Sequence, residues 1–357
     1  MKKLLMKGNI ALCEGAIAAG CKAYFGYPIT PQNEVPAHMS KRMVELDRIF
    51  LQAESELAAI NMVLGAGATG TRVMTSSSSP GISLKQEGIS YLAGCEIPAV
   101  IANIQRGGPG LGNIAGSQAD YFQSTKGGGH GDYRTLVLAP DSMQEMYDLT
   151  FEAFDLSEKY RNPALILSDG IVGQMMEPIE IGHKKAVQNN SPKDWILDGC
   201  KNRPPRLLRS LLMEEGALEQ HNLKLQKKYN DITKNEVRFE AYNMEDAEVV
   251  LVAFGISARV AKSASRQARE QGIKAGVIRP ITLWPFPKEP IAKAAKTAKC
   301  ILVVEMNLGQ MVEDVKLSVN GICPVEFHGK SGGSPVNERD VLEKIKSLQN
   351  EKVSSKT

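Results

Sequence analysis

The sequence predicts an α/β protein in which a doubly wound parallel sheet is followed by a smaller α/β domain. From residue 8 to about residue 180, short apolar runs that end in Gly, Pro or Ser alternate with helical stretches. Apolar strands that alternate with helices are typical of parallel strands buried on both faces. The alternation resumes after a polar segment, and 357 residues are many for one core, so we expect two domains with a connecting segment.

The first predicted domain spans residues 1–180. Its strands are short apolar runs, and the stretches between them repeat apolar residues with helical periodicity. Helices are predicted over residues 9–19, 55–66, 83–93 and 142–159. The predicted strands are Ala23–Tyr27, Arg48–Gln52, Arg72–Thr75, Ala99–Gln105, Leu136–Leu138 and Ala164–Leu167.

The remainder of the chain divides into three parts. Residues 181–240 are rich in Lys, Asn, Gln and Arg, and the Leu-spaced stretch Leu207–Leu225 predicts a linker with a helical excursion suited to docking. Residues 241–348 are the second predicted domain, and residues 349–357 are expected to fray. The apolar runs that predict a small parallel sheet in this domain are AEVVLVAFG, KAGVIRP, KCILVVEMN and CPVEFHG.

Composition limits the classes of function. The net charge is +3, with 43 basic and 40 acidic residues interspersed, which disfavours a nucleic-acid or membrane-surface protein. Glu14 interrupts the apolar N-terminal stretch, so we expect neither a secretory signal nor a bilayer span. The cysteines, at positions 13, 21, 95, 200, 300 and 323, show no CxxC spacing. This pattern predicts thiols in a reducing cytoplasm and no metal site built by this chain alone.

The stretch from Gln52 to Gly70 predicts a helix that is apolar on almost every side but has two acids in its first turn, Glu54 and Glu56. At 3.6 residues per turn, Glu56 shares its face with apolar residues and Glu54 does not. We therefore expect Glu54 to be solvated and Glu56 to be enclosed. The helix dipole is sufficient to explain Glu54. An enclosed carboxylate loses hydration, so Glu56 is either a paired structural group or a working acid.

Consecutive strand ends place distinctive residues at one edge of the predicted sheet. In open α/β sheets, ligands bind beyond the carboxyl ends of the strands. The first strand is followed by the rigid turn Tyr27–Pro31, the second by Glu56, the third by the hydroxyl-rich Thr75–Gly81 and the fourth by Arg106. A guanidinium beside flexible glycines suits a planar anion, most simply a substrate carboxylate. The sequence therefore predicts a ligand site at this edge.

Two stretches match known sequence motifs, but we do not assign either of them the usual function of its motif. Gly65, Gly67 and Gly70 spell the dinucleotide fingerprint GxGxxG, but they close a helix instead of opening one, so we interpret them as a helix end and turn. Residues 169–170 and 189–190 resemble the GDG…N magnesium and diphosphate motif of thiamine-diphosphate enzymes. The first glycine is absent and the spacing is short, so we interpret this match as coincidence.

Several runs in both predicted domains carry a resemblance to a known family. The runs are FGYPITP at 25–31, QAESELAAINMVLGAG at 52–67, VMTSSSSPGISLKQEGISYLAG at 73–94, RGGPGLG at 106–112, SQADYFQSTKGGGHGDY at 117–133, VIRPITLWPFP at 277–287 and VVEMNLGQM at 303–311. In these runs the chain resembles the alpha (pyrimidine-domain) subunit of the 2-oxoacid:ferredoxin oxidoreductases. Within the family it is most similar to the branched-chain, 3-methyl-2-oxobutanoate (2-ketoisovalerate) type, and 2-oxoglutarate enzymes are also similar.

The resemblance implies a fold, a cofactor and partners. The first domain would be a pyrimidine-binding thiamine-diphosphate domain, and the second would be a transketolase C-terminal-like domain. A beta-type partner subunit would supply the diphosphate and Mg²⁺ site and at least one [4Fe-4S] cluster. Gamma- and delta-type subunits, ferredoxin and coenzyme A are the other implied partners, and the cysteine spacing independently agrees that this chain builds no cluster.

The resemblance also implies residue roles. Glu56 would contact N1′ of the aminopyrimidine and act as the catalytic acid. Thr30 and Arg106 would hold the carboxylate and carbonyl side of the substrate. The implied cofactor-binding residues are Pro28, Ile29, Thr30, Glu56, Ser76 and Ser77.

The implied activity is oxidative decarboxylation of a 2-oxo acid to acyl-CoA and CO₂, with reduction of ferredoxin. For 2-oxoglutarate, a cationic pocket must meet a second carboxylate, and Lys126, His130 and Arg134 could serve there or simply line the surface. Lys126–Tyr133, KGGGHGDY, is either a lid or a wide turn. A non-catalytic docking subunit is the alternative from another class, and a nicotinamide dehydrogenase, which rests on Gly65–Gly70, is a third class.

Overall fold

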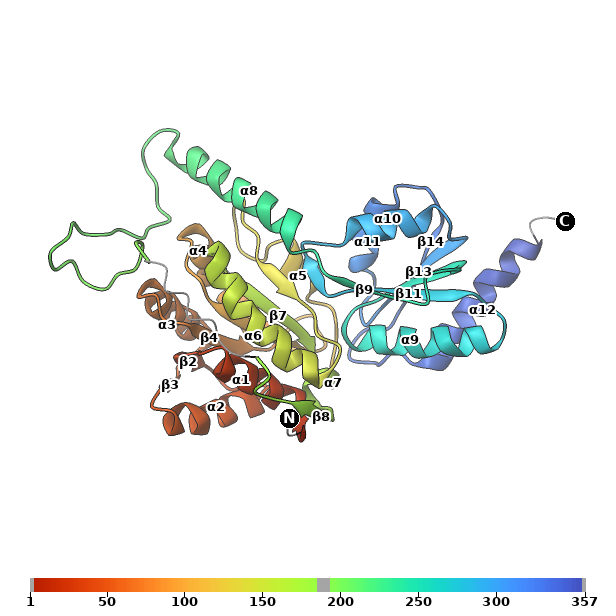
Figure 1. Cartoon of the computed structure of the whole chain (residues 1–357), viewed down its shortest axis with the longest axis horizontal. Coiled ribbons are helices and arrows are strands. Elements are labelled where there is room, and N and C mark those ends of the chain that lie inside the picture. Colours follow the sequence, from red (N-terminus) through yellow and green to blue (C-terminus); the bar gives the residue numbers. More distant parts are fainter. Residues whose placement is uncertain (1–2, 185–192, 355–357) are drawn as a thin grey trace.

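The computed structural model describes residues 3–184 and 193–354 of the chain. Two sheets, each covered by helices on both faces, lie side by side along the long axis of the molecule (Figure 1). The larger sheet contains the predicted strands of the N-terminal half, and the smaller sheet contains those of the C-terminal half. None of the helices in the described part of the chain is long and apolar enough to cross a bilayer.

The larger sheet has seven strands within the described residues, and the six predicted strands are all present with ends that differ slightly. These six run parallel, and β2 lies between β3 and β4. The seventh strand, β12, comes from far along the chain and pairs antiparallel with β6. The order across the sheet is β12 (Thr282–Trp284), β6 (Leu136–Leu138), β7 (Ala164–Asp169), β5 (Val100–Gln105), β4 (Val73–Ser77), β2 (Ala23–Gly26) and β3 (Ile49–Gln52).

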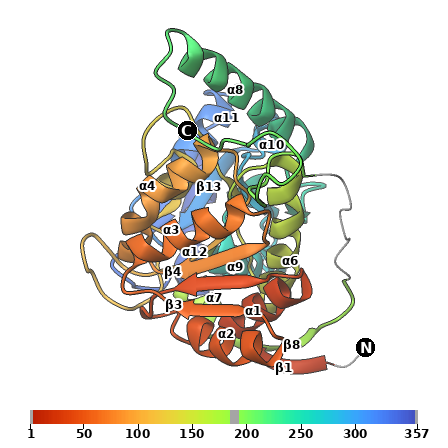
Figure 2. The same ribbon diagram turned by 90° about the vertical axis from the view of Figure 1, so that its left-hand side faces the viewer.

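Helices cover both faces of the larger sheet. One face packs against α1 (Gly8–Ala18), α2 (Glu34–Glu45) and α6 (Met143–Tyr160), and the other packs against α3 (Glu56–Ala68) and α4 (Pro80–Gly94). Viewed from the end of the molecule, α1 and α2 lie on one side of β3 and β4, and α3 and α4 lie on the other (Figure 2). The predicted helices are present, and α2 is a helix that the sequence pattern did not predict.

Three shorter features complete the first half. The strands β1 (Lys3–Lys7) and β8 (Met176–Glu180) form an antiparallel ribbon. The sequence pattern did not predict this ribbon, because both strands are short and contain charged residues. The helices α5 (Tyr121–Thr125) and α7 (Gly170–Gln174) each form little more than one turn.

The linker helix begins later than predicted. The amphipathic pattern begins at Leu207, but α8 spans Ala217–Asn235. Pro204 and Pro205 disfavour helix in the residues that lead into this stretch, and Gly216 has a φ of +74°, so α8 begins after it. The residues that α8 buries against the first sheet's helices are Leu225, Tyr229 and Ile232.

The smaller sheet contains the four predicted parallel strands and one antiparallel edge strand that was not predicted. Its order is β14 (Val325–Gly329), β13 (Cys300–Glu305), β10 (Val249–Val252), β11 (Ala275–Pro280) and β9 (Phe239–Tyr242), where β9 is the antiparallel strand. The helices of this half are α9 (Gly255–Glu270), α10 (Lys288–Ala295), α11 (Met311–Val319) and α12 (Glu338–Ser354). α12 runs through residue 354, whereas the sequence pattern predicts a frayed end from residue 349.

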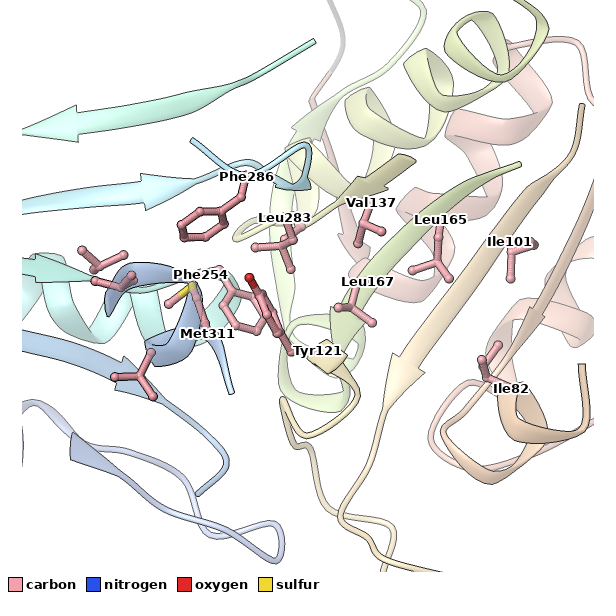
Figure 3. Packing of buried hydrophobic residues seen from close by; sticks show 14 of the residues in the cluster. Ile82, Ile101, Tyr121, Val137, Leu165, Leu167, Phe254, Leu283, Phe286 and Met311 are labelled. Carbon is pink, nitrogen blue, oxygen red and sulfur yellow. The ribbon is translucent and has the colours of Figure 1, made fainter. Parts of the chain in front are cut away.

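One hydrophobic core continues from the first sheet into the second. Tyr121 of α5 lies beside Phe254 and Met311 of the second half, with Leu167 of β7 on its other side (Figure 3). The rings of Tyr121 and Phe254 have centroids 5.9 Å apart. Leu283 on β12 belongs to the same cluster. The two halves therefore share buried apolar surface, which stabilises their arrangement.

Candidate active site at the carboxyl edge of the larger sheet

The strand order creates a crevice at the carboxyl edge of the larger sheet. The chain passes from β2 to β3 on one side and then crosses back to β4 on the other side of β2. Such a reversal separates the loops that leave adjacent strands, and ligands of open α/β sheets bind at this point. The turn Tyr27–Pro31 leaves β2, and residues 76–79, called here the serine run, close β4. The strand ends that the sequence brings to one edge are therefore neighbours in the structure.

Glu56 lies in a buried position beside this crevice. It is the first residue of α3, after Ser55, whose side chain caps the helix by accepting from the Ala58 N–H at 3.1 Å. The Glu56 residue is 5% exposed, whereas Glu54 is exposed, which confirms the predicted asymmetry. Glu54 precedes the capping residue, so its placement in the first turn was wrong.

The carboxylate of Glu56 has spare hydrogen-bonding capacity. Among the described residues, its hydrogen-bond donor is the Ser77 hydroxyl, at 3.5 Å from Oε1. An ionised carboxylate offers about four acceptor positions. A buried carboxylate with one long hydrogen bond is costly unless another donor completes it. This acid is therefore suited to accept a donor from a bound molecule.

A glycine keeps the space around this carboxylate open. A β-carbon on Gly81 of α4 would lie 2.1 Å from the Ser77 hydroxyl and 2.4 Å from Glu56 Oε1. Real β-carbons do not approach other atoms so closely, so the site requires glycine at this position. The start of α4 can therefore approach the carboxylate without filling the space around it.

The serine run is held by two buried networks. In the first, the Ser76 hydroxyl donates to Gln32 at 2.6 Å and accepts from the Tyr24 hydroxyl at 2.7 Å. This network ties β4 to the turn that follows β2, and it uses the Ser76 hydroxyl that the resemblance assigns to the cofactor. The hydroxyl of Ser78 is buried and has no hydrogen-bond partner within the described structure.

The second network joins the serine run to Arg106 through Asp120. The Ser79 hydroxyl donates to Asp120 at 2.7 Å and accepts from the Arg106 backbone N–H at 3.0 Å. Asn103 also donates to Asp120, at 2.8 Å. Burial raises the pKa of Asp120 above its ordinary value, and the hydrogen bonds from Ser79 and Asn103 oppose that rise. Asp120 therefore ties the end of β4 to the end of β5 on one side of the crevice.

Arg106 and Thr30 meet through the backbone. The Arg106 guanidinium donates to the Thr30 carbonyl at 3.0 Å and to the Leu111 carbonyl at 2.9 Å. Its Nε is buried and has no partner among the described residues. The remaining N–H groups are those that a planar anion would use.

The other predicted residues of the turn line its rim. Pro28 is exposed, and Ile29 and Thr30 are partly buried. The Thr30 hydroxyl accepts from Asn33 at 3.1 Å. The turn is also braced from within, since the Gln32 amide donates to the Tyr27 carbonyl at 3.3 Å. The structure therefore gathers the predicted residues at one edge, with Ser76 held inside the network below.

Lys85 is a buried cation beside this site that the sequence analysis missed. Its side chain is fully buried, and Nζ donates to the Thr75 hydroxyl at 2.5 Å and to the Ser76 carbonyl at 3.3 Å. Burial lowers the pKa of Lys85 to about 7, and the charge of Glu56 acts in the opposite direction. The signal was available, because Lys85 has helical spacing to Ile82 and Ile89 on the apolar face of α4.

The loop that follows α5 lies elsewhere. Lys126 pairs with Asp314 of α11 at 2.5 Å, and His130 lines a cavity of about 180 Å³ together with His221 of α8. The Arg134 guanidinium donates to the carbonyl of the preceding residue. These three side chains therefore lie at the surface, with Lys126 at the contact between the two halves, which is one of the two interpretations that the sequence left open.

The two discounted motifs have structural explanations. Gly65 and Gly67 lie within the end of α3, and Gly70 has a φ of +80°, so these glycines form the predicted helix end and turn. Asp169 caps α7 by accepting from the N–H groups of residues 171 and 172 at 2.9 and 3.0 Å. Asn189 and Asn190 lie outside the described residues.

Comparison with protein families covers nearly the whole chain. Residues 14–244 match the family described as pyruvate flavodoxin/ferredoxin oxidoreductase, thiamine-diphosphate-binding. Residues 247–341 match the pyruvate:ferredoxin oxidoreductase core domain II. The resemblance found in the sequence is thereby confirmed.

Curated relatives match end to end. The chain is 52% identical to the ketoisovalerate oxidoreductase subunit VorB of Methanothermobacter marburgensis, over 98% of this chain and 99% of the relative. It is 35% identical to the 2-oxoglutarate synthase subunit KorA of Methanothermobacter thermautotrophicus, over 96% of this chain and 98% of the relative.

Solved structures confirm the fold class. The 2-oxoglutarate:ferredoxin oxidoreductase of Magnetococcus marinus superposes with a TM-score of 0.84 at 24% identity, over 97% of this chain and 65% of that chain. A split-gene transketolase superposes with a TM-score of 0.62 at 15% identity, over 96% of this chain and 98% of that chain. At these identities the similarity shows the fold alone, a larger α/β domain followed by a smaller one. The thiamine-diphosphate-binding description of the first domain comes from the family match.

Proposed function

The chain belongs to the 2-oxoacid:ferredoxin oxidoreductase family, and from this premise we propose that it supplies the cofactor-activating half of a thiamine-diphosphate site. The observation that carries the proposal is the buried carboxylate of Glu56, which has one long hydrogen bond and an open approach over Gly81. An aminopyrimidine fits these features, because its ring nitrogen can share a proton with a carboxylate and its flat face tolerates close backbone approach. Residues 1–180 would form the pyrimidine domain, and residues 241–348 the transketolase C-terminal-like domain.

The residues of this chain would have separate roles at the cofactor. Glu56 would hold a proton on its carboxylate against the pyrimidine nitrogen, and Ser77 would orient that carboxylate. Pro28, Ile29 and Thr30 would form the rim against which the ring rests. When bound, thiamine diphosphate supplies a thiazolium that accepts the electron pair released as CO₂ leaves the 2-oxo acid.

Arg106 would orient the substrate's carboxylate with the N–H groups that the carbonyls of Thr30 and Leu111 leave available. We favour 3-methyl-2-oxobutanoate as the substrate. Two features support an aliphatic side chain: the ketoisovalerate-type relatives, and the exposed Leu111 and Ile114 in the loop that follows Arg106.

Partner subunits would complete the enzyme. We propose that a beta-type subunit carries the diphosphate and Mg²⁺ site and a [4Fe-4S] cluster, with gamma- and delta-type subunits, ferredoxin and coenzyme A as further partners. The described residues contain no group of three His, Cys, Asp or Glu side chains placed to hold a metal ion. The names of the curated relatives identify them as subunits.

The test of this proposal is Glu56→Gln in the assembled complex. Gln keeps the shape of the side chain but cannot hold the shared proton. We expect substrate-dependent dye reduction to fall by about 10²-fold or more, with assembly unchanged in size-exclusion chromatography. Glu54→Gln is the matched control, because it makes the same change on an exposed neighbour. Unchanged turnover in the Glu56 variant would identify the chain as a non-catalytic docking subunit.

Substrate choice needs a separate measurement. The wild-type complex is assayed with 3-methyl-2-oxobutanoate and with 2-oxoglutarate at equal concentrations, and kcat/KM is compared. We expect the branched substrate to be preferred, because Lys126, one of the candidates for a second carboxylate, is already paired with Asp314. A preference for 2-oxoglutarate would reject this assignment and leave the cofactor role of Glu56 intact.

A further inference from the structure

Lys85 lies at the contact between α3 and α4, beside the serine run. Gly81, Lys85 and Gly88 share one face of α4 at helical spacing. A β-carbon on Gly88 would lie 2.6 Å from Ile60 of α3, so the two glycines allow the helices to approach closely. This contact closes Lys85 off from solvent, and its side chain is fully buried. A fully buried lysine is uncommon in proteins, so its hydrogen-bond partners indicate its role.

The partners of Lys85 are neutral oxygens of the strand that carries the serine run. Two hydrogen bonds, to the Thr75 hydroxyl and the Ser76 carbonyl, hold the ammonium against the end of β4. Ser77, the next residue, donates to Glu56. No carboxylate within the described residues forms an ion pair with Lys85, and the charge that acts on it is that of Glu56.

The other titratable groups around Lys85 and the serine run have hydrogen-bond partners of their own. On β2, Tyr24 reaches the serine run through Ser76, and burial raises its pKa, so it remains protonated. Asp120 reaches the far end of the run through Ser79. On α4 itself, Glu87 accepts from Tyr91 at the surface. Glu56 is therefore the carboxylate whose charge acts on Lys85.

We propose that Lys85 is a positioning residue for Glu56, with an ammonium that anchors the serine run and offsets the buried carboxylate only while it is protonated. The proposal rests on the proposed function of Glu56. A lysine whose pKa is near 7 would lose this charge as pH rises through neutrality. The affinity of the site for the cofactor would then fall above neutral pH, because Lys85 has lost its charge.

The experiment compares pH profiles of the assembled complex. Wild type, Lys85→Met and Lys85→Gln are assayed between pH 5.5 and about pH 9, a range that brackets a pKa near 7. In parallel, calorimetry measures the affinity of each cofactor-depleted complex for thiamine diphosphate. Lys41→Met is the matched control, because Lys41 on α2 is 76% exposed. Met keeps the length of the side chain without a charge, and Gln retains a donor for Thr75.

We expect kcat/KM and cofactor affinity of wild type and Lys41→Met to fall about tenfold as pH rises through 7. Both Lys85 variants should lack this step and remain, at every pH, at the level that wild type reaches on the alkaline side. Lys85 variants that keep the wild-type step in both measurements would overturn the proposal. If the wild-type complex consumes no 2-oxo acid, the proposed function fails and this inference fails with it. If Glu56→Gln is inactive but both Lys85 variants match wild type, the Lys85 inference alone fails.

Discussion

Burial of the Lys85 ammonium makes the stability of the chain depend on pH. The unfolded chain keeps its proton up to the ordinary pKa of 10.5, whereas the folded chain releases it near 7. Between these values the unfolded state binds more protons, so stability rises with pH. Below pH 7 both states are protonated, and the folded chain bears the full cost of a buried charge.

Lys85→Met should therefore stabilise the isolated chain most at low pH. The gain in the free energy of unfolding over wild type should be largest below pH 7. It should shrink toward pH 10 by at most about 1.4 kcal/mol per pH unit. Urea unfolding at several pH values measures this, with Lys41→Met as the exposed control. A gain independent of pH would mean that the folded chain keeps Lys85 protonated throughout this range.

Single residues were predictable where helical spacing alone decides burial. Glu56 was found in this way, and the same spacing on α4 would have found Lys85. Asp120 was not predictable, because its partners Ser79 and Asn103 come from the ends of two different strands. Only the strand order of the sheet brings these three residues together.

At the scale of the element, α4 approaches the site through a glycine face. Gly81→Ala should push a methyl group into Ser77 and Glu56, since its β-carbon would lie 2.4 Å from Glu56 Oε1. Overpacking of this kind costs about 1–3 kcal/mol, so we expect thiamine-diphosphate affinity to fall about tenfold or more in calorimetry.

The control for this change is Gly65→Ala in α3. A β-carbon there would meet no atom within 4 Å, so alanine should raise helix stability by about 0.5–1 kcal/mol and leave cofactor affinity unchanged. Equal effects of the two substitutions on affinity would show that the glycine face of α4 is not part of the cofactor site.

Elements were predictable where apolar runs or helical repeats are long. The six parallel strands of the larger sheet follow such runs. α2 was missed because its apolar stripe is narrow and Pro36 stands in its first turn. The start of α8 was misplaced because the leucine spacing continues back to Leu207, beyond the residues that form helix. Strand β9 lies at the edge of its sheet beside β11, so its sequence is partly polar.

At the scale of the whole molecule, residues 117–126 attach the first half to the second. The Gln118 amide donates to the Phe254 carbonyl at 2.8 Å, and Gln310 donates to the Ala119 carbonyl at 2.7 Å. The Tyr121 hydroxyl donates to Asp314 at 2.6 Å within the shared core. Asp120 lies in the same segment, so contacts with the second half help to hold the crevice.

Tyr121→Phe should therefore destabilise both halves together. The substitution leaves the buried Asp314 without one of its donors, which costs about 1–3 kcal/mol. Calorimetry should show one unfolding transition at a lower temperature. Tyr91→Phe removes a surface hydroxyl bonded to Glu87 and should change the temperature little. Two separate transitions in the variant would mean that the halves fold independently.

The attachment between the halves was not predictable, because amide-to-carbonyl contacts leave no pattern in a sequence. The second sheet was predicted from its apolar runs, but the sequence did not reveal that β12 leaves that half to join the first sheet.

The position of β12 has a consequence for synthesis. Strand β6 emerges from the ribosome early. Its partner β12 is made only after β9, β10 and β11 of the second sheet. Until then, the unpaired edge of β6 is open to pairing with other chains. We therefore expect the nascent N-terminal half to be prone to aggregation, and a gene truncated before residue 282 should yield aggregates in place of a smaller working domain.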